Sequence, residues 1–476
     1  MRLITAEQIW VDGAFRSGYA VEIRGDEITW VGPLAERAGS LAGHRAGHRA
    51  GGLAGDQHIP PGAAGSEGRV TVEDWGRVAI VPGTVNAHNH SFQSLLRGIA
   101  DDEPFFVWRD RALYRFAPLL GAEGVYIGAL LAFGEMLGYG VTTVNDFFYI
   151  HDGGNDNAEA VIQAARELGI RLVLTRTMYD WTGAPASFVE TVEDATRRTR
   201  RLVEKYASDS MVRVYPAPHS PHAASPEMIK AGWRVAEETG TYFHMHVAEG
   251  QYEVKQIRDQ YGLSPIQWLE SLGVLGPRLV VVHGVWLDEE DIRRLGGAGA
   301  GLAYNPASNM FLGDGVTKLP EMLAAGVRVA LGTDGGCSNN RTSIFDEMRT
   351  CALLQKVARL DGAALSAETV FHLGTAGGGE VLGLPIGRIA PGYKADLVAL
   401  DLDDISLYPP HNLLKNIVYS MSPTAVRRVM VGGRLVWANG ELLTVPMARI
   451  RRLVESLTAG WREILEAGGK GVGSGA

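Results

Sequence analysis

Two histidines that are one residue apart, His88 and His90, end an apolar run that begins at Val78 and passes through Pro82 and Gly83. In an extended strand, residues i and i+2 point to the same side, so both imidazoles can reach one metal ion. An isolated His-x-His pair is equally compatible with two hydrogen-bonded or solvated histidines. The interpretation therefore depends on whether the ends of other strands provide further ligands.

The stretch from about residue 78 to 385 repeats one pattern, in which a β-rich run ends in polar residues and a helical segment follows. The predicted strands span residues 78–90, 142–149, 171–179, 212–220, 242–249, 279–285, 302–308 and 327–334. Strands that alternate with helices favour a parallel sheet, and eight is the number that closes a (β/α)8 TIM barrel. A doubly wound open sheet is the alternative, although no Gly-x-Gly-x-x-Gly loop follows the first strand.

Functional residues of a (β/α)8 barrel lie at the C-terminal ends of its strands. The predicted ends, or the strands leading to them, carry His88, His90, His219, His244, His246, Glu249, His283 and Asp334. Imidazoles from the first and fifth strands and a carboxylate from the eighth form a nitrogen and oxygen site with an open position for water. We therefore predict one divalent metal ion, with Zn²⁺ favoured and Fe²⁺ as the alternative. Its predicted ligands are His88, His90, His246 and Asp334.

The segments on either side of the predicted barrel domain (residues 84–385) have a different pattern of predicted secondary structure. Residues 1–83 and 386–445 contain short β-like runs separated by tight turns, and we expect them to pair with each other. Residues 35–69 form a low-complexity insertion with too few large apolar residues to pack, which outweighs a metal-binding role for its histidines. A closing helix is predicted from about residue 446 to 467, within a C-terminal helix and tail that span 446–476.

The composition is that of an ordinary globular chain. Its 476 residues are 46% hydrophobic and 21% charged, and a formal net charge of −9 argues against a surface for nucleic acid or anionic membrane. Its two cysteines, Cys337 and Cys351, form no disulfide framework. The sequence contains no apolar run of 18 residues. We therefore expect a soluble, cytoplasmic protein with no nucleic-acid or membrane partner.

The chain combines the motifs Pro82-Gly83, His88-Asn-His90, His246, His283, Gly332-Thr-Asp334 and the run at 392–398. Together these motifs resemble the amidohydrolase superfamily over nearly the whole chain. Five further runs resemble one branch of this superfamily, the cytosine deaminase-like branch of S-adenosylhomocysteine/methylthioadenosine deaminases and triazine hydrolases. These runs are residues 95–102, 218–221, 246–249, 304–309 and 331–340. The resemblance implies a metal-bearing barrel with a small β-sandwich built from both termini. It also implies a possible homo-oligomer, since such proteins commonly form dimers or tetramers.

The resemblance bears on the metal count and on the mechanism. No lysine stands at the end of the fourth predicted strand, where two-metal relatives carry a carboxylated lysine, so we expect one ion. The ion would lower the pKa of a water toward ~7, with Asp334 as base and His283 orienting the nucleophile. Glu249 would protonate a ring nitrogen and then the departing amine, which leaves poorly unprotonated, whereas a chloride needs this less. The competing interpretation of Glu249 is a solvated loop carboxylate.

Four residues are predicted to bind the substrate, each with an alternative or a restriction. The resemblance places His219 against the ring or sugar, with a structural hydrogen bond as the alternative. Trp108 lies near the pocket wall of relatives, although simple packing explains it equally well. Asn309 lies on the loop after the seventh strand and can orient the pocket. Arg176 matches one of the arginines that hold the amino-acid carboxylate in deaminases of S-adenosylhomocysteine.

The sequence departs from those deaminases where they hold the rest of that substrate. Ala117 stands where they carry a glutamate for the ribose hydroxyls, and residues 180–188 offer no second arginine. Tyr179 and Trp181 instead predict an apolar stacking pocket for a planar heterocycle.

The leading hypothesis is thus a metal-dependent hydrolase of carbon–nitrogen bonds that deaminates an aminated N-heterocycle, with purine or adenosine-type compounds as the nearest named substrates. Its reactants would be that small molecule and water. The alternatives are a guanine/8-oxoguanine-, pterin- or s-triazine-type aminohydrolase or chlorohydrolase. The hypothesis from a different class is a non-catalytic amidohydrolase-like scaffold.

Overall fold

Two four-stranded sheets form the centre of the protein in a computed structural model that describes residues 1–37 and 71–469. Their strand orders are β11-β10-β9-β8 and β12-β13-β14-β15, and neighbouring strands run parallel. The first sheet comprises β8 (Thr84–Asn89), β9 (Val141–Phe148), β10 (Arg171–Met178) and β11 (Val212–Pro218). The second comprises β12 (Phe243–Val247), β13 (Leu279–His283), β14 (Gly301–Tyr304) and β15 (Arg328–Leu331).

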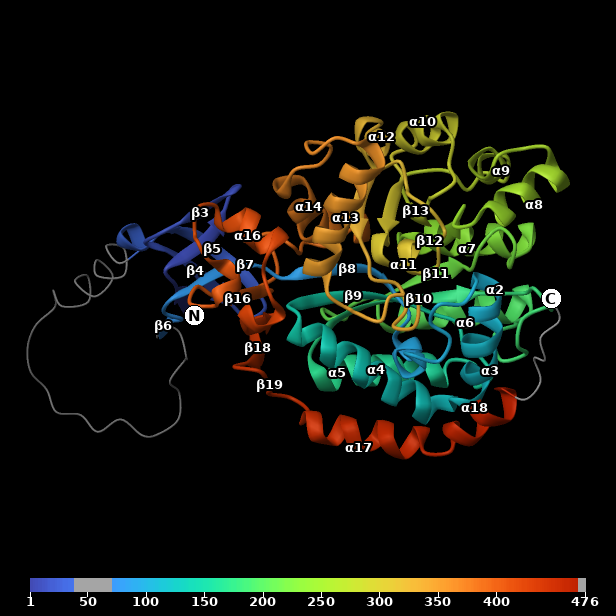
Figure 1. Cartoon of the computed structure of the whole chain (residues 1–476), viewed down its shortest axis with the longest axis horizontal. Coiled ribbons are helices and arrows are strands. Elements are labelled where there is room, and N and C mark those ends of the chain that lie inside the picture. Colours follow the sequence, from blue (N-terminus) through green and yellow to red (C-terminus); the bar gives the residue numbers. More distant parts are fainter. Residues whose placement is uncertain (38–70, 470–476) are drawn as a thin grey trace, which may run out of the picture.

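Helices follow these strands and cover them (Figure 1). Nearly every residue of the eight strands is buried, which explains why they read as continuous apolar runs rather than as alternating ones. The helices between and after the strands are α4 (Gly121–Gly138), α5 (Asp156–Leu168), α6 (Val192–Lys205), α7 (Pro226–Thr239), α8 (Gln251–Tyr261), α9 (Pro265–Ser271), α10 (Glu289–Gly297), α11 (Pro306–Phe311), α12 (Leu319–Ala324), α13 (Ile344–Arg359), α14 (Ala367–Gly374) and α15 (Ala376–Leu382). The result is the alternating α/β order that the sequence predicts.

Backbone hydrogen bonds join the two sheets at the C-terminal ends of their strands. The amides of Thr333 and Asp334, just after β15, donate to the carbonyl of His88 on β8 at 3.1 and 2.9 Å. The amide of His246 on β12 donates to the carbonyl of His219, just after β11, at 3.0 Å. The edge strands of both sheets therefore meet at the end where the polar residues lie.

Two of the predicted strands are wrong in detail. The single strand predicted at 78–90 is divided at Gly83 into β7 (Val78–Pro82) and β8, which belong to different sheets. A Cβ at Gly83 would lie 2.1 Å from Thr142 Oγ1, so the chain passes β9 where only glycine fits. The strand predicted at 302–308 ends at Tyr304, because Pro306 starts α11 as its first residue.

The terminal segments build two further sheets together. One has the order β5-β4-β1-β6, and the other has the order β19-β18-β17-β16-β7-β2-β3, in which β16 pairs antiparallel with β7. A buried cluster includes Ile4 and Val21 from the first sheet and Ile80 and Leu397 from the second. The strands are β1 (Arg2–Thr5), β2 (Gln8–Val11), β3 (Ala14–Arg16), β4 (Tyr19–Arg24), β5 (Glu27–Pro33), β6 (Thr71–Asp74), β16 (Leu397–Asp401), β17 (Val426–Val431), β18 (Arg434–Ala438) and β19 (Glu441–Leu442).

The C-terminal end differs from its prediction. The single helix expected at 446–467 is two helices, α17 (Met447–Thr458) and α18 (Trp461–Gly469), with a break that contains Gly460, a weak helix former. Helix α17 lies along α4 and buries Ile450 there (Figure 1). A further short helix, α16 (Leu413–Tyr419), precedes β17. Of the predicted insertion at 35–69, all but the first three residues lie outside the described residues.

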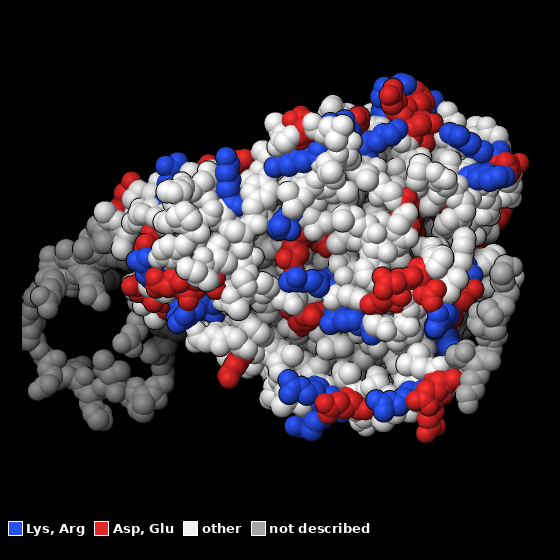
Figure 2. All heavy atoms as spheres, viewed as in Figure 1, with Lys and Arg blue, Asp and Glu red and all other residues white. Residues whose placement is uncertain are grey.

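Basic and acidic side chains are interspersed over the face of the molecule in Figure 2. Ion pairs join many charged side chains of the described residues, such as Arg97 and Glu135 at 2.7 Å. Within residues 1–37 and 71–469, no single helix is long and apolar enough to cross a membrane. One bent pair, Phe105–Leu119 with Gly121–Gly138 at 118°, passes that test by length and composition.

Candidate active site

The candidate metal ligands meet at the C-terminal ends of the parallel strands. Ligand atoms of His88, His90 and His246 lie within 4.8 Å of one another, and those of His88, His283 and Asp334 do the same. Asp334 Oδ1 lies 3.4 Å from His88 Nε2 and 3.2 Å from His90 Nε2. All five side chains are buried. Residues from β8, β12, β13 and the end of β15 thus converge on one point.

Backbone carbonyls fix two of these imidazoles. His90 Nδ1 lies 2.6 Å from the carbonyl of Phe147, and His246 Nδ1 lies 3.0 Å from the carbonyl of His219. A carbonyl only accepts hydrogen bonds, so Nδ1 carries the proton in both rings and Nε2 keeps its lone pair. Neither ring nitrogen of the fully buried His88 has a hydrogen-bond partner within the described residues. These nitrogens are suited to a cation.

The charge states of the cluster follow from burial. Burial lowers the pKa of His88 to about 4 and lowers that of His246 well below its ordinary value. Burial alone would raise the pKa of Asp334, but the neighbouring His88 and His90 hold it well below its usual range. Neutral imidazoles beside a carboxylate are the protonation states that a divalent cation requires.

At three strand ends, a residue other than glycine has a left-handed backbone conformation. Ala248 has a φ of 53°, His283 of 70° and Asp334 of 59°. Such residues are uncommon and concentrate at functional sites, where they aim side chains that a regular strand would direct elsewhere. Close approach matters as well, because a Cβ at Gly332 would lie 2.8 Å from the backbone nitrogen of His88. The strand ends are therefore shaped to bring these side chains together.

Glu249 and His283 form a second polar pair beside the cluster. His283 Nε2 lies 3.5 Å from Glu249 Oε1, and Asn309 Nδ2 donates to His283 Nδ1 at 2.9 Å. With Nδ1 accepting, the ring proton is on Nε2, which faces the carboxyl group. Burial raises the pKa of Glu249 well above its ordinary value, and the carboxylates of Asp314 and Asp334 raise it further. The surroundings of Glu249 therefore favour its protonated form.

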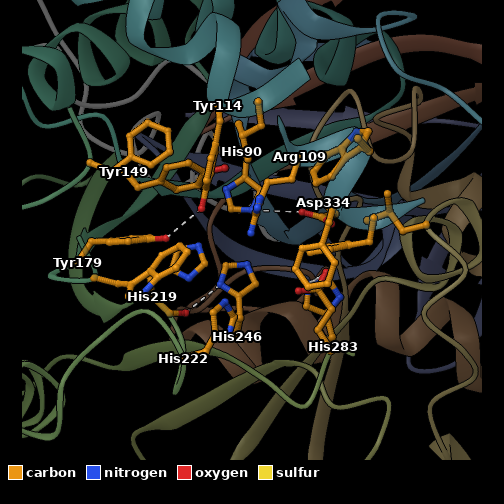
Figure 3. A pocket seen from close by; sticks show the side chains of 18 of the residues that line it. His90, Arg109, Tyr114, Tyr149, Tyr179, His219, His222, His246, His283 and Asp334 are labelled. Carbon is orange, nitrogen blue, oxygen red and sulfur yellow. Dashed lines mark hydrogen bonds and ion pairs between the residues drawn. The ribbon is translucent and has the colours of Figure 1, made fainter. Parts of the chain in front are cut away.

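A cavity of about 260 Å³ opens over this cluster. Much of its wall is aromatic, and Figure 3 shows Tyr114, Tyr149 and Tyr179 facing His90, His219 and His246. The hydroxyl groups of Tyr114 and Tyr179 lie 3.5 Å apart. A flat ring can thus stack in this cavity with one edge at the polar cluster.

The family model for the amidohydrolase family matches residues 79–436. The chain belongs to the amidohydrolase family. A 5-methylthioadenosine/S-adenosylhomocysteine deaminase from Syntrophobacter fumaroxidans is 37% identical over 390 residues, which cover 81% of this chain and 87% of that protein. A 5'-deoxyadenosine deaminase from Methanothermobacter thermautotrophicus is 36% identical over 391 residues, 82% of this chain and 89% of that protein.

Solved structures agree with the family. A zinc-bound adenosine deaminase from Xanthomonas campestris superimposes with a TM-score of 0.85 at 27% identity and covers 98% of both chains. An atrazine chlorohydrolase from Arthrobacter aurescens, at 24% identity and a TM-score of 0.84 over 96% of this chain and all of that one, shares the fold. This amidohydrolase therefore has the α/β fold of the TIM-barrel class, with a His-rich divalent metal site and a hydrolase reaction at carbon–nitrogen bonds.

The structure of the amidohydrolase brings part of the predicted substrate-binding set to the cavity. His219 and Trp108 line it, as do Tyr179 and Trp181. Trp108 is held there by a hydrogen bond from Nε1 to the carbonyl of Cys337 at 2.8 Å. Asn309 does not line the cavity but holds His283, so it affects the substrate only through that histidine.

Arg176 requires a correction. Its side chain is fully buried and does not line the cavity. The guanidinium group donates to both carboxylate oxygens of Glu190 at 2.8 and 2.9 Å, and Nε donates to Asn155 Oδ1 at 3.0 Å. Because its side chain is fully buried and all three guanidinium nitrogens donate inside the protein, Arg176 cannot reach a substrate carboxylate in the cavity. We therefore assign Arg176 a structural role in place of the predicted substrate-binding one.

Other cavity residues escaped the sequence-based prediction. Phe105, Phe106, Arg109 and Tyr114 come from the short helices α2 (Phe105–Trp108), η2 (Arg109–Leu113) and α3 (Tyr114–Phe116). Arg109 is the one lysine or arginine among the described residues that line the cavity, and it lies over the ring of Tyr114 at 4.6 Å. The many aromatic residues between 105 and 116 could have indicated that this segment lines the cavity. A short irregular segment gives no periodicity from which to tell which of them face the cavity.

Proposed function

We propose that this amidohydrolase is a metal-dependent hydrolytic deaminase that releases ammonia from an aminated N-heterocycle of the purine or adenosine type. The observation that carries the proposal is the buried Glu249, which lies 3.5 Å from His283 beside the histidine and aspartate cluster and whose pKa is raised by burial. An amine leaves poorly unless it is protonated, so deamination requires an acid at this position. The names of the relatives, methylthioadenosine/S-adenosylhomocysteine deaminase and 5'-deoxyadenosine deaminase, support the same reaction class.

We assign the metal to His88, His90, His246 and Asp334. The unpartnered nitrogens of His88 and the free Nε2 lone pairs of His90 and His246 support this ligand set. Three nitrogens and one oxygen suit Zn²⁺, with Fe²⁺ as the alternative. When bound, such an ion supplies a water whose pKa is lowered toward ~7.

The chain's own residues hold and move the protons. Ser308 Oγ donates to Asp334 Oδ2 at 2.6 Å, which leaves Oδ1 facing His88 and His90, where it would contact the ion and accept the proton of the attacking water. His283 donates from Nε2 to the negative charge that develops on the attacking oxygen. Glu249 gives its proton to the ring nitrogen beside the attacked carbon. The proton that Asp334 took from the water then passes to the departing amine, and the new hydroxyl group returns a proton to Glu249 as it becomes the carbonyl of the product.

One observation favours a second group of substrates. Among the described residues that line the cavity, the carboxyl groups are those of Glu249 and Asp334, and both are engaged in the chemistry. Ala117 is buried away from the cavity, so no carboxylate stands ready for ribose hydroxyls. This supports guanine/8-oxoguanine-, pterin- or s-triazine-type amines as the alternative, with a chlorinated triazine as the variant that needs Glu249 least.

The architecture that holds the site is part of the proposal. The hydrogen bonds between His88 and residues 333–334 and between His219 and His246 support closure of the two parallel sheets into one (β/α)8 barrel over residues 84–385. The shared apolar cluster supports a β-sandwich of residues 1–83 and 386–445, with 446–476 as an appended helical segment and tail. A homo-oligomer, a cytoplasmic location and the absence of nucleic-acid and membrane partners stay predictions.

An ammonia-release screen with the zinc-loaded protein tests the function. The panel contains adenosine-type thioethers, guanine, 8-oxoguanine, aminopterins and aminotriazines. We expect ammonia from at least one of these amines and about one equivalent of transition metal in the natively purified protein. Turnover of chlorinated or amide compounds alone would overturn the deaminase proposal. Protein that is isolated without metal and binds none would favour the scaffold.

A further inference from the structure

Arg109 places one permanent positive charge in the wall of the cavity. Its side chain is 22% exposed, and no other lysine or arginine of the described residues lines the cavity. A guanidinium group is always protonated in proteins, so this charge does not depend on pH. The carboxyl groups that line the described cavity are those of Glu249 and Asp334, and neither forms an ion pair with Arg109. The residues of the reaction therefore do not neutralise this charge.

Two aromatic rings hold the guanidinium group in place (Figure 3). It lies over the ring of Phe106 at 5.0 Å and over the ring of Tyr114 at 4.6 Å. Ring faces stabilise a cation without using the N–H donors at its edge. An ordered guanidinium group with available donors is the side chain that matches the planar geometry of a carboxylate.

The internal partner of Arg109 lies outside the cavity. Arg109 Nε donates to Asp110 Oδ1 at 2.8 Å, and Nη2 lies 2.8 Å from the same oxygen. The side chain of Asp110 is 58% exposed and does not line the cavity, and so exposed an ion pair contributes little to stability. Within residues 1–37 and 71–469, Nη1 of Arg109 forms no hydrogen bond. The edge formed by Nη1 and Nη2 is therefore available to a ligand.

Hydroxyl donors lie in the same wall. The hydroxyl groups of Tyr114 and Tyr179 share one hydrogen bond at 3.5 Å, so the pair has a second proton that it can donate to a ligand. Burial raises the pKa of both hydroxyl groups, which keeps them protonated. This wall thus offers a cation and an O–H donor to the part of the substrate that does not react.

We propose that Arg109 is a specificity-determining residue that binds a carboxylate group of the substrate, with the hydroxyl pair of Tyr114 and Tyr179 as a further donor. The inference rests on the proposed function, because it takes this cavity as the site of deamination. It narrows the substrate class to aminated N-heterocycles that bear a carboxylate. A neutral heterocycle would cover the guanidinium group without supplying an anion, and its binding is therefore weaker.

Binding of matched ligand pairs tests the inference without turnover. The pairs are pterin-6-carboxylate with pterin and adenosine-5′-carboxylate with adenosine, and in each pair one member has a carboxylate that the other lacks. The full-length, zinc-loaded protein carries Glu249→Gln in every sample, so that the ligands are not consumed. Isothermal titration calorimetry measures the dissociation constants. In at least one pair, we expect the carboxylate to bind about ten- to hundredfold more tightly than its neutral partner.

Three variants and a control assign this preference to its residue. Arg109→Met removes the charge at similar side-chain length, and it should abolish the preference while leaving the affinity for the neutral member nearly unchanged. Arg109→Lys keeps the charge without the planar donors, so an intermediate preference is expected. Asp110→Asn removes the internal partner and should keep or increase the preference. The matched control is Arg111→Met, because Arg111 is 53% exposed, pairs with Glu103 and does not line the cavity.

Each outcome decides the inference. A preference that persists in Arg109→Met would overturn it, because the carboxylate would then bind the metal or another residue. Equal losses for both members of a pair would also overturn it, since a merely structural role of Arg109 gives that result. Loss of the preference in Asp110→Asn, or no preference in either pair with Arg109 present, would count against it equally.

Two results remain separable from this test. If Arg109→Met does not fold, the preferences of Arg109→Lys and Asp110→Asn decide. Failure of the deaminase proposal is a different result, because the ammonia screen would then be negative while the preference that depends on Arg109 remains.

Discussion

The two halves of the cavity are built in different ways. In the half that faces the predicted metal, hydrogen bonds to the scaffold fix several polar side chains, as the Phe147 carbonyl fixes His90 and Asn309 fixes His283. In the half that faces the substrate, most of the wall is aromatic and comes from α2, η2, α3 and loops. Strand ends therefore carry the reaction, and the irregular segments carry the choice of substrate.

Among the variants that test this division, we expect the largest loss of activity for Glu249→Gln. An amide has no proton to give to a leaving amine, so kcat should fall by about 10²–10⁴-fold. The metal content should stay unchanged, because Glu249 is not among the assigned ligands. Steady-state kinetics with the best amine of the screen and metal analysis of the same sample measure both.

The control for this variant is Glu237→Gln, whose side chain is exposed on α7. A Glu249→Gln enzyme that keeps more than about one-tenth of the kcat would show that the metal-facing half does not supply the acid.

The difference between the two halves also explains what the sequence could predict. His88 and His90 share one face because a strand has a period of two. His246, His283 and Asp334 could be predicted with them because each ends another predicted strand, and the strand ends of a (β/α)8 barrel meet at one face. The division of the first strand at Gly83 was missed, because it depends on contact with Thr142, a residue distant in sequence. Arg109 and Tyr114 were missed because their orientation depends on a short π-helical segment, η2, that has no sequence period.

Arg176 tests the division between the two halves, because it belongs to strand β10 but was predicted to bind the substrate. Arg176→Met should leave KM unchanged and lower the free energy of unfolding by roughly 3 kcal/mol, because it removes one partner of a buried ion pair with Glu190. Urea unfolding and steady-state kinetics measure the two effects.

The matched control is Arg97→Met, which breaks a half-buried pair with Glu135 and should cost less than about 1 kcal/mol. A large rise in KM for Arg176→Met, with little loss of stability, would return Arg176 to the substrate-facing half.

The aromatic wall should respond differently from the acid. Trp181 lines the cavity and is 39% exposed. Trp181→Ala should raise KM by about three- to tenfold at nearly constant kcat, because stacking binds the ground state and the transition state alike. Tyr261→Ala is the control, since Tyr261 is 36% exposed and lies outside the cavity lining. An equal loss of kcat in Trp181→Ala would mean that this half also takes part in the chemical step.

The smallest effect concerns the environment of the acid. Glu249 acts while protonated, so activity is present below its pKa and is lost as the pH rises through that value. The Asp314 carboxylate raises the pKa of Glu249, and Asp314 itself has a pKa raised to about 7 by burial, so this influence is exerted above about pH 7. Asp314→Asn should therefore move the alkaline limb of the kcat profile to lower pH by about half a unit to one unit.

The profile is measured from about pH 6 to pH 9, with Asp259→Asn, an exposed aspartate on α8, as the control. A shift of the alkaline limb to higher pH, or an equal shift in both variants, would show that Asp314 does not act on Glu249. Burial and the Asp334 carboxylate would then be enough to raise the pKa of Glu249, and the acid would depend on the metal-facing half of the cavity alone.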